Sequence, residues 1–72
     1  MSYTEIREQA KIIESAIGIK LNVEYPHYMN PGACVLSNPK FGKCFMSLEQ
    51  GHLTFGGSND RLYHMIMAWF NE

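Results

Sequence analysis

The stretch SNDRLYHMIMAWFN, residues 58–71, holds more apolar surface than any other part of this 72-residue chain. On a helix that turns 100° per residue, four apolar side chains fall in one narrow sector: Leu62, Met65, Ile66 and Trp69. Three more widen the apolar arc to about 200°, twice what a one-sided helix needs: Tyr63, Met67 and Phe70. The pattern predicts a C-terminal helix whose second apolar flank a single sheet covers only in part.

The start of this helix is marked by polar residues. Ser58 or Asn59 is placed to act as N-cap, because either side-chain oxygen can accept a hydrogen bond from an amide of the first turn. Asp60 adds a negative charge at the positive end of the helix dipole. The flank with Met67 either completes the protein's own core or is kept for another surface, and the sequence leaves both interpretations open.

Composition limits the classes of protein that the chain can belong to. A hydrophobic share of 46% with 18% charged residues differs from the low-hydrophobicity, high-charge composition of disordered chains. We therefore expect residues 1–72 to form a single compact domain, close to the lower size limit for a stable core. Six Lys and Arg against seven Asp and Glu give a net charge of −1, so no overall field attracts nucleic acid or anionic membranes.

The ends of the chain and its cysteines indicate a cellular compartment. The first ten residues lack the apolar segment of a signal peptide, and no run approaches the about 20 apolar residues of a membrane span. Cys34 and Cys44 are too few for a secreted disulfide scaffold and lack CxxC spacing. We expect a cytoplasmic protein with reduced thiols, no membrane contact and the dimensions of a complete small gene product.

An N-terminal helix is predicted by a capping box and an apolar stripe. Ser2 and Glu5 have the spacing at which each side chain accepts from the other residue's amide. Apolar residues then recur with helical spacing along one face: Ile6, Ala10, Ile13 and Ile17. Gly18 suits the left-handed position after the last helical residue, where we expect the helix to end.

Between the helices the apolar period changes to two, which predicts strands at residues 19–25, 33–37, 43–49 and 52–55. Two prolines and a glycine make residues 26–32 a loop, and residues 38–42 form the turn of a hairpin. The expected fold is α+β, a two-layer sandwich in the order α-β-β-β-β-α. It has a three- to four-stranded antiparallel sheet with both helices on one face. The expected inner face consists of Ile19, Leu21, Val23, Leu36, Met46, Leu48, Leu53 and Phe55.

The residues that carry chemistry form no pattern typical of an enzyme or a metal site. The only candidate zinc ligands are His27, Cys34, Cys44 and His52, and their spacing matches no zinc signature. The three histidines and the carboxylates fall at cap, loop or solvent positions, so no acid–base or Cys–His pair can be assigned. Residues 56–58 are explained as a turn into the last helix. We expect neither metal nor cofactor nor catalytic residues.

Nucleic-acid binding is the alternative function that the sequence leaves open. The hairpin interleaves two lysines with two aromatic residues, a mixture that holds single strands by phosphate contact and base stacking: Lys40, Phe41, Lys43 and Phe45. The order of elements also resembles that of double-stranded-RNA-binding domains, which carry a basic cluster where the second helix starts. This chain has Ser58, Asn59, Asp60 and only one cation, Arg61, at that point.

The main prediction is a non-enzymatic protein-binding module, a stand-alone inhibitor or regulator of a larger protein, as phages and other mobile elements encode. Tyr, Trp, Phe and Met are the residue types enriched at the centres of protein interfaces. The predicted partner-binding residues are the helix flank and part of the loop: Tyr63, Met67, Phe70, Tyr28 and Met29. A homodimer formed through the same helix flank is a further possibility.

Overall fold

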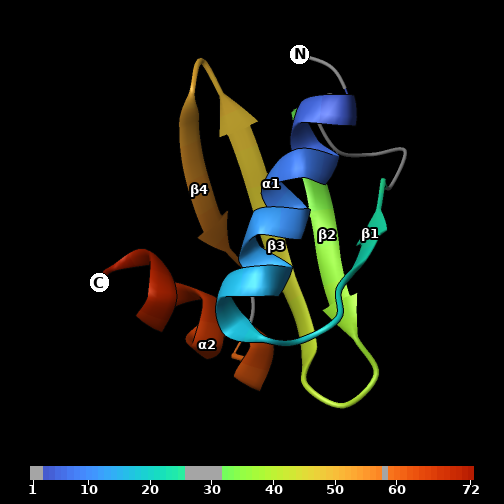
Figure 1. Cartoon of the computed structure of the whole chain (residues 1–72), viewed down its shortest axis with the longest axis vertical. Coiled ribbons are helices and arrows are strands. Elements are labelled where there is room, and N and C mark those ends of the chain that lie inside the picture. Colours follow the sequence, from blue (N-terminus) through green and yellow to red (C-terminus); the bar gives the residue numbers. More distant parts are fainter. Residues whose placement is uncertain (1–2, 26–31, 58) are drawn as a thin grey trace.

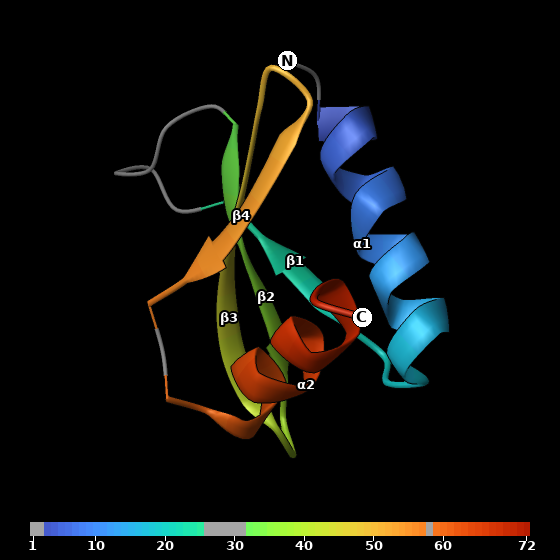
Figure 2. The same ribbon diagram turned by 90° about the vertical axis from the view of Figure 1, so that its left-hand side faces the viewer.

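The protein is described here by a computed structural model that covers residues 3–25, 32–57 and 59–72. Its elements are α1 (Tyr3–Ile17), β1 (Asn22–Glu24), β2 (Ala33–Asn38), β3 (Gly42–Glu49), β4 (His52–Gly56) and α2 (Arg61–Phe70). The four strands form one antiparallel sheet in the order β1-β2-β3-β4. Both helices lie on the same face of this sheet (Figure 1, Figure 2). The predicted α+β class and the order α-β-β-β-β-α are confirmed.

Helix α1 buries the stripe that its sequence predicts. Ile6, Ala10 and Ile13 are buried, and Ile17 packs against the same core at the last turn. The helix ends where the amide of Gly18 donates to the carbonyl of Glu14, with 2.9 Å between nitrogen and oxygen. Ser2, one half of the predicted capping box, lies outside the described residues.

The register of the sheet sorts its side chains onto two faces. Cys34 of β2 lies opposite Met46 of β3, and Leu36 lies opposite Cys44, so these four side chains share the inner face that the helices cover. Phe55 of β4 lies opposite Met46 and extends this face to the edge strand. Between β3 and β4, Gln50 and Gly51 have φ values of 51° and 81°, as the tight turn of a two-residue hairpin requires.

The first strand is shorter than predicted. The alternation at residues 19–25 indicated a seven-residue strand, but only Asn22–Glu24 pairs with β2. The amide of Leu21 instead donates to the Glu14 carboxylate, with 2.7 Å between nitrogen and Oε2. The chain after α1 is therefore bonded to the helix before it joins the sheet. Glu14, expected at a solvent position, is half-buried by this contact.

The predicted N-cap of the second helix is wrong. Helix α2 begins at Arg61 with Asp60 as its N-cap residue, and Asp60 makes no side-chain capping bond. Its Oδ2 atom accepts a hydrogen bond from the amide of Lys43 at 2.8 Å. The amide of Leu62 donates to the carbonyl of Phe41 at 3.0 Å, so the turn between β2 and β3 satisfies an amide of the helix start. Asn59 is exposed, and Ser58 lies outside the described residues.

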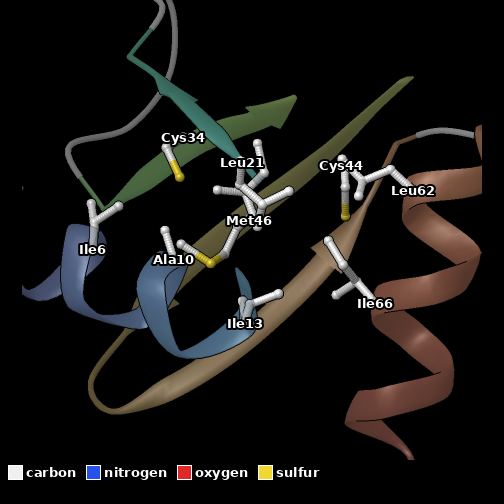
Figure 3. Close-up of a cluster of buried hydrophobic side chains, with 10 residues drawn as sticks. Ile6, Ala10, Ile13, Leu21, Cys34, Cys44, Met46, Leu62 and Ile66 are labelled. Atoms are coloured by element: carbon white, nitrogen blue, oxygen red, sulfur yellow. The ribbon is translucent and has the colours of Figure 1, made fainter. Parts of the chain in front are cut away.

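One apolar cluster joins both helices to the sheet (Figure 3). Its buried members are Ile6, Ala10, Ile13, Leu21, Cys34, Leu36, Cys44, Met46, Leu62 and Ile66. In the close-up, Cys34 lies near Ile6 on the α1 side of this cluster, whereas Cys44 lies near Leu62 and Ile66 of α2 (Figure 3). Of the predicted inner face, Leu21, Leu36, Met46 and Leu48 are buried, while Ile19, Val23, Leu53 and Phe55 are partly buried.

Candidate protein interface

Helix α2 buries one side of its wide apolar arc and leaves the other partly open. Leu62 and Ile66 are completely buried against the sheet. Tyr63 and Met67 are half-buried, and Phe70 is 42% exposed. We call Tyr63, Met67 and Phe70 the α2 flank. The prediction that the rest of the protein covers this flank only in part agrees with these exposures.

The α2 flank is continuous with the core through one aromatic contact. The rings of Phe55 and Phe70 have their centroids 5.0 Å apart at an interplanar angle of 76°, an edge-to-face arrangement. Phe55 comes from the inner face of β4, an edge strand of the sheet, and packs against the core. The apolar surface thus runs from the core, past the edge of the sheet, to the exposed ring of Phe70.

The opposite side of the arc also remains partly accessible. Met65 and Trp69 were predicted to lie with Leu62 and Ile66 at the centre of the buried sector, but both are only half-buried. Trp69 packs against the core, and its ring lies 6.2 Å from that of Phe70 between centroids. The two fully buried side chains of α2, Leu62 and Ile66, therefore lie one turn apart. Tyr63 and Trp69 on either side of them pack at the edge of the core.

The other predicted partner-binding residues, Tyr28 and Met29, lie outside the described residues, as does His27. Among the side chains that the structure describes, one large exposed apolar residue was not singled out by the sequence: Ile12 of α1 is 52% exposed. On a helix of 100° per residue it lies about 100° from Ile13, off the buried stripe. That offset is the signal in the sequence that could have identified it.

The four hairpin residues proposed for nucleic-acid binding do not share one surface. Phe41 packs against the core, with the Lys40 ammonium 5.5 Å and the Arg61 guanidinium 5.6 Å from its ring centroid. Lys43 and Phe45 belong to the outer face of the sheet, where Phe45 is 38% exposed. Of the two aromatic rings expected to stack on bases, Phe45 alone lies on this face.

Within the described residues, the two cysteines are buried in the core and the two histidines are exposed. Cys34 and Cys44 are free and completely buried. Burial raises the pKa of each thiol from 9.0 to about 11. His52 and His64 are exposed, as predicted. Within residues 3–25, 32–57 and 59–72, no three His, Cys, Asp or Glu residues are grouped so that they could hold a metal ion.

Comparisons with known proteins identify no relative of this chain. The chain matches no protein-family model, and neither the curated proteins nor the solved structures include a similar chain. Within the described part of the chain, neither helix has the length and apolar character needed to cross a membrane.

Proposed function

We propose that the protein is a non-enzymatic binding module that docks on a larger protein through the α2 flank and thereby inhibits or regulates it. The observation that carries this proposal is the edge-to-face contact of Phe55 with Phe70, which continues the apolar core onto an exposed surface. In a domain this small, apolar area left outside the core is a large fraction of what could stabilise the fold. Apolar area that stays exposed at the surface of a protein is typical of an interaction surface.

The composition of the α2 flank fits such a role. Tyr63 and Phe70 are of aromatic types that are enriched in interface cores. Aromatic side chains have few rotatable bonds that must be fixed on binding. Met67 lies one turn from Tyr63 and has a flexible thioether chain that can adapt to the shape of a partner. The buried free thiols Cys34 and Cys44 fit a reducing compartment, and we place the protein in the cytoplasm on that ground.

The test compares two exposed phenylalanines on opposite faces of the sheet. Phe70→Glu places a charge on the α2 flank, and Phe45→Glu is the matched control, since the two rings are 42% and 38% exposed. The tagged wild type and each tagged variant are incubated with lysate of the cells that naturally contain the protein, with and without nuclease treatment, and the captured proteins are quantified. Circular dichroism of each variant verifies that the fold is retained.

We expect wild type and Phe45→Glu to capture the same larger protein, and Phe70→Glu to lose it while remaining folded. Equal capture by Phe70→Glu contradicts the proposal. Capture that disappears with nuclease and with Phe45→Glu favours the nucleic-acid alternative instead. If sedimentation shows a wild-type dimer that Phe70→Glu converts to a monomer, the flank binds a second copy of this chain.

A further inference from the structure

A groove runs between α1 and the edge strand β1, away from the α2 flank. Figure 1 shows β1 and α2 on opposite sides of α1, so this groove is separate from the α2 flank. It encloses a volume of about 370 Å³ and is lined by Arg7, Ala10, Lys11, Glu14, Leu21, Asn22 and Val23. Ala10 and Leu21 are buried and form an apolar floor. The charged ends of α1 side chains border it.

One wall of the groove is a strand with an open edge. Among the described residues, strand β1 pairs with β2 alone and so forms one edge of the sheet. The outward backbone groups of such an edge strand can pair with a further strand. Neither proline nor lysine, the residues that usually block such an edge, occurs within Asn22–Glu24. The Leu21 amide is already bonded to Glu14, so the open stretch starts at Asn22.

The other wall carries more positive than negative charge. Arg7 and Lys11 are one helical turn apart, are exposed, and both line the groove. The Glu14 carboxylate also lines it, but its Oε2 atom accepts the Leu21 amide at 2.7 Å. Glu24 lies on the outer face of the sheet, where it accepts a hydrogen bond from the Ser37 hydroxyl at 3.0 Å. Two cations thus face the groove against one carboxylate that is already engaged.

We propose that this groove binds an extended peptide segment with an acidic side chain. The segment pairs with the open edge of β1 as a fifth strand, which is a common mode of peptide recognition. At about 3.3 Å per residue, about three residues of the segment lie along Asn22–Glu24. An acidic side chain on the helix side meets Arg7 and Lys11. An apolar side chain two residues along the segment shares that face and covers Ala10 and Leu21. Charge complementarity therefore selects the occupant, and backbone pairing fixes its direction.

The experiment selects peptides without assuming their sequence. A display library of random decapeptides is panned on the wild-type protein, and the best binders are synthesised with a fluorescent label for anisotropy titration. Arg7→Gln with Lys11→Gln removes the two cations from the groove. The matched control is Lys40→Gln with Lys43→Gln, which removes the same charge from the β2–β3 hairpin. NMR chemical shifts of the complex locate the binding site.

We expect the selected peptides to be enriched in Asp or Glu and to shift the amides of residues 7–14 and 21–24. The groove variant weakens binding by about ten-fold or more, equivalent to about 1.4 kcal/mol, while the hairpin variant and Phe70→Glu bind as wild type does. N-methylation of the peptide amides that pair with β1 abolishes binding. Selection of no peptide, of peptides without acidic enrichment, or of peptides that tolerate every N-methylation overturns the proposal. Equal weakening by the hairpin variant also overturns it.

Discussion

Asp60 and Lys43 join the start of α2 to the β2–β3 hairpin, because the Asp60 Oδ2 atom accepts the Lys43 amide at 2.8 Å. The two residues are 17 positions apart, and both are exposed at the surface. The carboxylate that sequence alone assigns to the helix dipole therefore fixes the helix to the sheet. Together with the bond from the Leu62 amide to the Phe41 carbonyl, it joins the start of α2 to the β2–β3 hairpin, while the buried side chains of Leu62 and Ile66 hold the helix on the sheet.

Replacing Asp60 with alanine is expected to destabilise the fold by about 1 kcal/mol, since a hydrogen bond to a charged acceptor is lost at an exposed site. The free energy of unfolding is measured by urea titration. Asn59→Ala is the control, because Asn59 is the exposed residue next to it and its removal should change stability by less than about 0.5 kcal/mol. Equal values for the two variants would show that the bond to Lys43 contributes nothing.

Gly42 is expected to tolerate alanine less well than Gly51. Both have positive φ, 99° and 81°, so alanine costs about 1 kcal/mol at either position. A Cβ atom at Gly42 would in addition overlap the Asp60 carboxylate, whereas one at Gly51 meets open space. Urea titration should give Gly42→Ala a loss at least about 1 kcal/mol larger. If both variants lose the same stability, Asp60 does not pack against the hairpin as described.

The buried thiols contribute a part of the free energy of unfolding that is lost at alkaline pH. Burial raises the pKa of Cys34 and of Cys44 to about 11 from 9.0, so the folded state favours the neutral thiol. This contribution is complete below pH 9 and is lost as the pH rises from 9 to 11, because the unfolded chain ionises first. The double variant Cys34→Ala, Cys44→Ala should lose less stability than wild type between pH 8.5 and 10.5. Parallel losses in urea titrations, run with a reductant, would refute this.

The fold could be predicted because its signals are local. The stripe of α1 and the alternation in β3 each bury one face, and the periods of 3.6 and 2 express this directly in the sequence. Lys43, Cys44 and Phe45 alternate between exposed and buried as their period predicts. Residues 19–21 imitate a strand because Ile19 and Leu21 also pack toward the core. They do not pair with β2, and the Leu21 amide donates instead to the Glu14 carboxylate seven positions earlier.

The candidate site could be predicted only in part, because its decisive contacts join distant residues. Helical spacing placed Tyr63, Met67 and Phe70 on one flank, and their partial exposure agrees with it. The contact of Phe55 with Phe70 depends on how α2 meets β4 and has no local signal. The sequence grouped Phe41 with Phe45 in the hairpin, but the period cannot show that a turn residue such as Phe41 packs partly buried against the core.

The proposed contact of the α2 flank with a larger protein can be captured by photo-crosslinking from position 70. Phe70 is replaced with p-benzoylphenylalanine, which keeps an aromatic ring at the exposed position, and Phe45 carries the same group in the control protein. Each protein is produced in the cells that naturally contain it, and the cells are irradiated. We predict that position 70 gives one covalent adduct with a larger protein, and that position 45 gives the same adduct at least about ten-fold more weakly. Three results would contradict a larger partner at the α2 flank: equal yields from the two positions, no adduct from position 70, or an adduct with the mass of two copies of this 8.3 kDa chain.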